Sequence, residues 1–227
     1  DHRDRVSKLW ETFNRVACAN PYSWVRTPMT ADEIRNPGPS NRLVGFPYTK
    51  AMNSNWDLDQ AAAIILCSAE AAEAAGVSQD RWLFPHSGTD GADTNFVSNR
   101  ADLHSSPAIR VAGQRAMQLA GVTPDDLDHV DLYSCFPSAV QIAATELGLG
   151  VDRQLTQTGG LTFAGGPLNN YVTHSIATMA NVLRDDPGSV GFCSANGGYI
   201  TKHAFGVYST TPPTDGFQHQ DCQEEIN

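Results

Sequence analysis

The sequence has too few basic residues to build a positively charged face. Lysine and arginine together number 15 against 25 aspartates and glutamates, which gives a formal net charge of −10. Because a phosphate backbone is held mainly by positive charge, this balance argues against nucleic acid as a partner. A small, locally basic pocket is still compatible with it.

Long apolar runs and paired cysteines are also absent. No stretch approaches the roughly 20 consecutive apolar residues that a membrane-spanning helix needs. The cysteines are odd in number and form no C-x-x-C pair, which argues against a disulfide framework and a zinc site. They are Cys18, Cys67, Cys135, Cys193 and Cys222. We therefore expect no metal, no membrane span and a reducing, cytoplasmic compartment.

What is present suits one substantial core. A chain of 227 residues with 41% apolar content can bury about 70% of the surface that it exposes when unfolded. The first five residues, DHRDR, resemble neither a signal peptide nor a usual translation start. We expect further polypeptide in front of them.

The first hundred residues predict an irregular lobe. Apolar residues at helical spacing predict a helix over 6–19 that ends at Asn20-Pro21, and prolines then interrupt residues 21–47. The apolar run at 60–68 predicts a buried strand, followed by an alanine-rich helix over 69–75.

The remainder predicts alternating strands and helices. A short strand at 82–84 precedes a polar, glycine-containing loop, and Ser106-Pro107 opens a helix that ends at Gly121. Further strands are expected at 130–133, 189–195 and 204–208, and further helices at 138–147 and 170–183. This order predicts an α/β fold with helices covering a mixed sheet in αβα layers, from about residue 101 to 210. Residues 211–227 are acidic and aperiodic, so we expect a linker or a disordered tail there.

Four segments in this order resemble the thiolase superfamily. They are FNRVA with NPY, TPDDLDHVD leading to YSCF, the loop GGLTFAGGP, and ANGG near the end of the last strand pair. The sequence is most similar to sterol-carrier-protein-type thiolases and to actinobacterial thiolase-like proteins described as acetyl-CoA acetyltransferases. The resemblance implies a thiolase-like fold: residues 1–100 would be a remnant of the N-terminal and loop region, and 101–210 the C-terminal domain.

The resemblance also implies acyltransferase chemistry in lipid metabolism. That chemistry needs a thiolate nucleophile, a base that activates it, oxyanion donors and a second acid or base. The nucleophile of the family lies in an N-terminal half that this chain does not contain. Gly166 stands where the family has its activating histidine, and Ala195 stands where it has its second cysteine. One missing general base typically costs about 10² to 10⁴ in rate, so standard thiolysis is doubtful.

Three residues are candidates for a reorganised catalytic site. Tyr133 carries a phenol that can donate to an oxyanion, His203 follows the loop after Asn196, and Cys193 is two residues from the family's cysteine position. The predicted substrate-binding residues are Phe136, Gly165, Gly166, Pro167, Asn196, Gly197 and Gly198. No cofactor is expected, and a coenzyme A thioester would be substrate or ligand.

Structural explanations compete with each of these assignments. Gly166 also fits a tight turn or a close backbone approach, and Cys193 and Cys135 fit small buried hydrophobic residues. Tyr133 can be a core tyrosine, and His203 or His174 an ordinary isolated histidine.

Three functional hypotheses follow. The first is a thiolase-like acyl-CoA acyltransferase whose missing N-terminal half supplies the nucleophile. The second is a non-catalytic acyl-CoA-binding or scaffolding protein, and the third is a subunit of an aldolase-like acyl-CoA complex with Tyr133 as proton donor. We expect an acyl-CoA-type ligand, the missing N-terminal half and homo-oligomerisation as partners.

Overall fold

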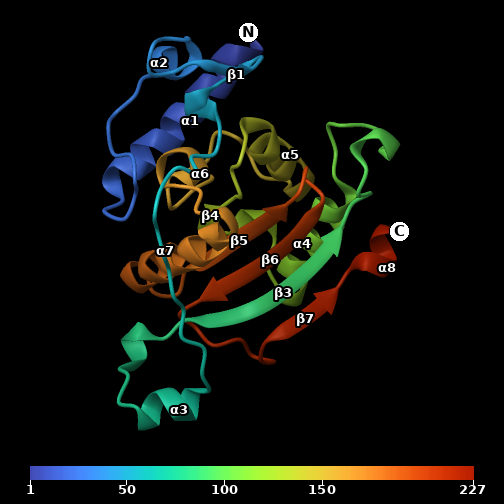
Figure 1. Cartoon of the computed structure of the whole chain (residues 1–227). Helices are drawn as coiled ribbons and strands as arrows, with labels where there is room; N and C mark the ends of the chain where they lie inside the picture. Colours follow the sequence, from blue (N-terminus) through green and yellow to red (C-terminus); the bar gives the residue numbers. More distant parts are fainter.

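A five-stranded mixed sheet organises the chain, and the computed structural model describes all residues, 1–227 (Figure 1). The strand order is β4-β5-β6-β3-β7. β5 and β6 pair antiparallel, β3 adds antiparallel to β6, and β4 and β7 join parallel to β5 and β3. The strands are β3 (Phe84–Ala92), β4 (His129–Asp131), β5 (Val190–Gly197), β6 (Lys202–Ser209) and β7 (Gln218–Asp221). The predicted mixed sheet is confirmed.

Helices cover the two faces of this sheet. Successive side chains of β5 point to opposite faces: Phe192 joins the main core with α4 and α5, whereas Cys193 packs with Met179 and Leu183 of α7. Figure 1 shows α7 in front of the sheet and α4 behind it. The covering helices are α4 (Pro107–Leu119), α5 (Pro137–Leu147) and α7 (Tyr171–Asp185). The layers are those that the αβα prediction required.

Local sequence signals set the ends of these helices. Ser106 caps α4 by accepting a hydrogen bond from the N–H of Ile109 at 3.1 Å, and Pro107 follows in the first turn. Gly148 ends α5 with a φ of 72°, a left-handed conformation that glycine adopts at little cost. Both boundaries were predicted.

The strand β3, which lies between β6 and the edge strand β7, was predicted largely as a loop, and that prediction was wrong. Ser87 and Thr89 of this strand are buried, and their hydroxyls donate to the α4 carbonyls of Ala116 and Ala112, each at 2.7 Å. These bonds satisfy polar side chains inside the core.

The N-terminal lobe is irregular, as expected, around the long helix α1 (His2–Ala19). Trp10 and Phe13 of α1 stack with their ring centroids 4.9 Å apart, and both are buried. The other elements of the lobe are α2 (Ala31–Arg35), β1 (Leu43–Gly45), β2 (Tyr48–Thr49) and η1 (Lys50–Met52).

The predicted strand at residues 60–68 is extended but pairs with no other strand, which corrects that prediction. Ile65 is 90% exposed and Leu66 84% exposed. In Figure 1 the chain descends from η1 past α6 and α7 to α3 (Ala69–Ala74). An apolar strand of this kind needs neighbours on both sides, and this chain supplies none.

The tail was expected to be a linker or disordered, but it forms β7 and α8 (Gln223–Ile226). It packs on β3 because Gly91 has no side chain: a Cβ there would lie 2.3 Å from Cδ1 of Ile226. No helix has the length and apolar content to cross a bilayer. The remaining short elements are η2 (Gln79–Arg81), η3 (Val97–Asn99), η4 (Pro124–Asp126), α6 (Gly160–Phe163) and η5 (Leu168–Asn170).

Candidate functional site

A buried carboxylate anchors the segment that leads into the glycine-rich loop at residues 159–167. Asp131 is fully buried at the end of β4. Its Oδ2 accepts hydrogen bonds from the N–H groups of Gln157 and Thr158 at 2.7 and 3.0 Å. Its Oδ1 accepts from the hydroxyls of Tyr171 and Ser175 on α7 at 3.1 and 2.8 Å. These donors compensate the buried charge and fix the loop relative to α7.

The start of the loop packs directly against α1. Gly159 has a φ of 102°, and a Cβ there would lie 2.3 Å from the Cβ of Ala17 and 2.6 Å from its backbone nitrogen. The indole N–H of Trp10 donates to the Thr162 hydroxyl at 3.1 Å. Glycine is therefore required for close approach, and α1 holds the loop from outside.

The other side of the loop is held by residues 53–60, which we call the strap. The N–H of Gly166 donates to the carbonyl of Asn55 at 2.7 Å, and the N–H of Asn55 donates to the carbonyl of Leu161 at 3.0 Å. The strap thus pairs with the loop through the backbone, so the two segments form one unit.

The two central glycines make this approach possible. At Gly165, where φ is 121°, a Cβ would lie 2.3 Å from Oε1 of Gln60. At Gly166 it would lie 2.3 Å from the hydroxyl oxygen of Ser54 and 3.2 Å from the carbonyl oxygen of Asn55. Ser54 therefore occupies space that any side chain at residue 166 would need.

Cys135 links this unit to the end of β5. Its carbonyl accepts from the N–H of Ser54 at 3.1 Å, and its Sγ lies 3.8 Å from the amide nitrogen of Asn196, which donates to it. Burial raises the pKa of the Cys135 thiol to about 11. The thiol is therefore protonated at neutral pH and is a poor nucleophile.

Tyr133 lies beside Cys135 with its ring edge-on to that of Tyr171, the centroids 5.4 Å apart. Burial, and then the neighbouring Cys135 thiol, raise the pKa of Tyr133 to about 12. The phenol stays protonated at neutral pH, so it can donate a hydrogen bond.

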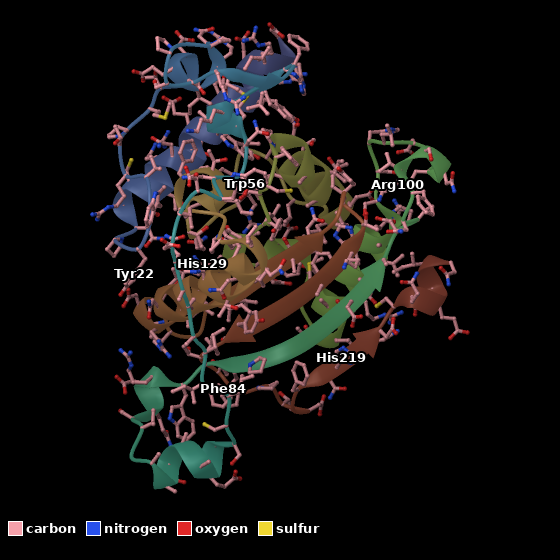
Figure 2. The ribbon with its side chains drawn as sticks, in the orientation of Figure 1. Tyr22, Trp56, Phe84, Arg100, His129 and His219 are labelled. Atoms are coloured by element: carbon pink, nitrogen blue, oxygen red, sulfur yellow. The ribbon has the colours of Figure 1, made fainter.

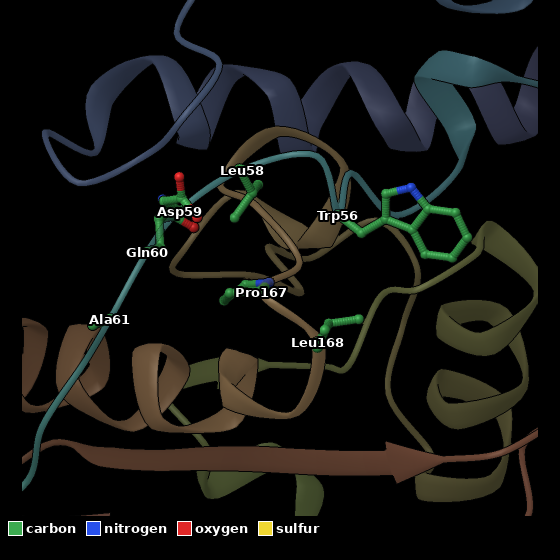
Figure 3. A pocket seen from close by; sticks show the side chains of 7 residues that line it. All are labelled: Trp56, Leu58, Asp59, Gln60, Ala61, Pro167 and Leu168. Atoms are coloured by element: carbon green, nitrogen blue, oxygen red, sulfur yellow. The ribbon is translucent and has the colours of Figure 1, made fainter.

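A surface cavity of about 470 Å³ opens where the strap crosses the end of the loop (Figure 3). Figure 3 shows Pro167 and Leu168 on the loop side and Trp56 on the strap, and Figure 2 locates Trp56 in the whole molecule. The lining includes one carboxylate, that of Asp59, and no lysine or arginine. The volume falls within the range of about 300 to 1,000 Å³ typical of small-molecule sites. The lining residues are Trp56, Leu58, Asp59, Gln60, Ala61, Pro167 and Leu168.

The other predicted binding residues lie around this unit. Phe136 at the start of α5 stacks on Tyr48 with centroids 6.2 Å apart. Gly197 is the last residue of β5, and Gly198, with a φ of 66°, begins the turn to β6. Asn196 is the residue that connects this turn to Cys135.

His203 faces the start of α4 from β6. It is 5% exposed, opposite Asn196 in the strand pair, and its Nε2 lies 3.5 Å from Oδ2 of Asp93. This contact lacks hydrogen-bond geometry, so Asp93 is an ion-pair partner only and Nε2 makes no hydrogen bond within the chain. Asp93 also accepts from the Ser106 hydroxyl and from the N–H of Ala108. Burial alone would raise the pKa of Asp93, but these donors and His203 lower it.

Cys193 lies in the core on the α7 side of the sheet. It is 2% exposed and packs with Met179 and Leu183. Burial, and then the charge of Asp131, raise the pKa of its thiol far above the ordinary value. Catalytic roles for Cys193, His203 and Tyr133 stay predictions.

The sequence interpretation missed three residues that build the site. Ser54 lies in a segment without periodicity, and Gln60 begins the run that was predicted as a buried strand, so no motif marks either as a site residue. Asp131 could have been predicted, because it lies in a short apolar strand. A carboxylate is buried in such a strand only when hydrogen-bond donors surround it.

Comparisons with known proteins agree with this architecture. Residues 89–170 match the family described as Thiolase C-terminal domain-like. An acetyl-CoA acetyltransferase from Methanocaldococcus jannaschii is 26% identical over 141 residues, covering 62% of this chain and 34% of that protein. One from Methanothermobacter thermautotrophicus is 24% identical over 203 residues, covering 82% and 51%.

A solved structure is similar over almost the whole chain. It is that of a monomeric SCP2-thiolase like protein type 1 from Mycobacterium smegmatis, with 36% identity and a TM-score of 0.83 over 93% of this chain and 47% of that one. The fold and the loop therefore define a thiolase-like α/β protein. Residues 89–170 correspond to a thiolase C-terminal domain-like region, and the chain as a whole is similar to thiolase-like proteins. It spans about half the length, or less, of these relatives.

Proposed function

We propose that this chain is the C-terminal half of a thiolase-like acyl-CoA acyltransferase that does not perform standard thiolysis. The proposal rests on the contacts around Gly166. The glycine-rich loop is hydrogen-bonded there to the strap, and the strap is hydrogen-bonded to Cys135. The strap and Cys135 hold the loop there, and the resemblance assigns the family histidine to residue 166, a glycine whose N–H donates to the carbonyl of Asn55. A backbone N–H cannot accept a proton, so it cannot activate a thiol.

The nucleophile is expected from outside this chain. Acyl transfer from a thioester needs a thiolate, which attacks the carbonyl carbon and displaces coenzyme A as its own thiolate. The Cys135 thiol, with a pKa of about 11, and the buried Cys193 thiol both stay protonated at neutral pH. The missing N-terminal half is the expected source of a reactive cysteine.

The cavity beside Pro167 suits the acyl end of such a thioester. Trp56, Leu58 and Leu168 give it apolar walls, and the Asp59 carboxylate repels anions. The phosphates of coenzyme A require cations, so they would bind elsewhere on the full-length protein.

Two observations favour the alternative functions. The combination of Gly166 and Ala195 favours a non-catalytic acyl-CoA-binding or scaffolding protein, because neither residue can transfer a proton. Tyr133, a protonated phenol beside Cys135, favours a subunit of an aldolase-like acyl-CoA complex in which it donates a proton.

The exposed apolar segment at residues 61–67 supports a partner polypeptide. Ile65 and Leu66 are largely solvent-exposed, and the segment pairs with no strand of this chain. A sheet in the missing half would cover it. A homo-oligomer is the other expected state, although the Mycobacterium smegmatis neighbour is described as monomeric. Five unpaired cysteines support a cytoplasmic location.

A turnover assay of the full-length protein tests the proposal. A panel of acyl-CoA substrates is assayed for acyl transfer, condensation, hydrolysis and thiolysis, and we expect transfer or condensation without efficient thiolysis. Binding without any turnover would support the scaffolding function, and activity that Tyr133→Phe abolishes would support the aldolase-like function. No turnover and no binding would refute all three.

A further inference from the structure

We propose that Arg100 is a positioning residue: its guanidinium holds the strained turn between β5 and β6, residues 198–201, and so fixes the end of β5 against Cys135. The inference rests on the proposed function, because it assigns the residues beside this turn to the acyl-thioester site. It adds a residue that lies outside the four thiolase-like segments. Figure 2 labels Arg100 on the loop that follows β3.

The strain lies at Ile200, inside the turn. Its φ is 52°, in the left-handed region, which a β-branched residue adopts only under constraint. Its side chain is half-buried and packs against the main core, which supplies part of the constraint. A residue in such a conformation persists only where the surrounding structure over-determines it. The contacts on either side of Ile200 therefore decide whether the turn keeps its shape.

Arg100 binds the turn on both sides of Ile200. Its Nη1 donates to the carbonyl of Tyr199 at 2.8 Å, and its Nη2 donates to the hydroxyl of Thr201 at 2.9 Å. Its Nε donates to the carbonyl of Thr94 at 3.0 Å, which fixes the guanidinium on its own loop. All three acceptors are uncharged oxygens, so arginine serves here as a planar fork of donors rather than as half of an ion pair.

A series of hydrogen bonds connects this turn to the candidate site. The N–H of Thr201 donates to the carbonyl of Gly197, the last residue of β5, at 3.1 Å. The preceding residue, Asn196, donates through its amide to Sγ of Cys135 at 3.8 Å. The carbonyl of Cys135 accepts from the strap. Arg100 therefore sets the position of residues 196–198 without touching the thioester itself.

Alkylation of Cys135 measures this position without any substrate. The full-length protein is treated with iodoacetamide at pH 8, and peptide mapping gives the rate at each cysteine. In Arg100→Ala the turn can relax, so we expect Cys135 to react at least about fivefold faster, the population shift that corresponds to strain at one residue. Buried Cys193 should stay unreactive. Arg184→Ala is the matched control, because Arg184 is also half-buried and also donates to a backbone carbonyl, that of Arg81. It should leave the Cys135 rate unchanged.

Two further variants test the fork and the strain separately. Arg100→Lys keeps the charge, but one ammonium group does not reach acceptors on both sides of Ile200, so this variant should behave like Arg100→Ala. Ile200→Asn places in the turn a residue that tolerates the left-handed conformation. Adding it to Arg100→Ala should therefore return the Cys135 rate toward that of the unmodified protein.

Turnover of acetyl-CoA by the same variants connects the position to function. Because only the ordered turn would bind substrate, its lower population should raise KM about fivefold or more and leave kcat unchanged. A general loss of folded protein would instead lower the apparent kcat, which separates the two explanations.

Each result has a distinct meaning. An unchanged Cys135 rate in Arg100→Ala, an equal rise at Cys193, or an ordinary rate in Arg100→Lys would overturn the positioning role. No recovery on adding Ile200→Asn would overturn the role of strain. If the unmodified protein neither binds nor turns over acetyl-CoA, the proposed function fails, while the alkylation rates still decide whether Arg100 fixes the end of β5.

Discussion

Replacing Gly166 by alanine tests whether the strap fills the space beside the loop. The backbone at Gly166 is not in the left-handed region, so alanine adds no backbone strain. Because alanine lowers the conformational entropy of the unfolded chain, it would by itself stabilise the protein by about 0.4–1 kcal/mol. Against this, its Cβ would lie 2.3 Å from the Ser54 hydroxyl oxygen. Overpacking of this kind costs about 1–3 kcal/mol. We expect a net loss of about 0.5–2 kcal/mol in the free energy of unfolding.

A second substitution should recover much of that loss. Ser54→Gly removes the hydroxyl and leaves the carbonyl of Asn55, 3.2 Å from the new Cβ, as the nearest atom. Urea unfolding of the two single variants and the double variant gives the coupling energy, expected to be about 1 kcal/mol or more.

Gly165→Ala is the matched control. It introduces strain at a φ of 121° and a contact with Gln60, not with Ser54. Ser54→Gly should therefore not rescue it. Additive effects of Gly166→Ala and Ser54→Gly, within about 0.5 kcal/mol, would show that the hydroxyl does not occupy this space.

Further predictions concern the groups around the loop. Asp131→Asn keeps the shape but removes the charge that its donors face, and urea unfolding should show a loss of about 1.5–3 kcal/mol; an unchanged midpoint would contradict the anchoring role. With iodoacetamide and peptide mapping at pH 8, exposed Cys67 should react well before Cys135, whose pKa is about 11, and the Cys135 rate should rise about tenfold per pH unit up to that value. Because the pKa of Asp93 is lowered by folding, its ionisation stabilises the protein above the unfolded pKa of about 3.9, and this stabilisation is lost as the pH falls through the folded value. Asp93→Asn should therefore destabilise the protein at pH 7, and the difference should shrink below about pH 4; a difference that stays constant with pH would contradict the role of this charge beside His203.

The sequence was sufficient where local chemistry decides the structure. Ser106 with Pro107 marks the start of α4, and Gly148 marks the end of α5, because capping depends on the residue at the boundary alone. The glycine-rich loop was predicted for the same reason, since closely spaced glycines allow a backbone path that other residues do not.

Tertiary partners decided the rest. The sequence of β3 predicted a loop because its serine and threonine residues are polar. Their hydroxyls are buried only because they donate to carbonyls of α4, which lie more than 20 residues away in the sequence. The apolar composition of residues 60–68 predicted a buried strand, but the segment lies exposed because no strand of this chain pairs with it.

The site itself was predictable only in part. Tyr133, Phe136, Gly166 and Asn196 were named from the thiolase-like segments, and their roles stay predictions. Ser54 was not, because its position depends on how the strap crosses the loop. No pattern along the chain encodes that crossing.

A crystal structure of the full-length protein with a hydrolysis-resistant acyl-CoA analogue tests the central claim most directly. We predict density for the acyl group in the cavity between Trp56 and Pro167. An analogue bound away from the strap and the loop would contradict the claim that these two segments form the acyl-thioester site.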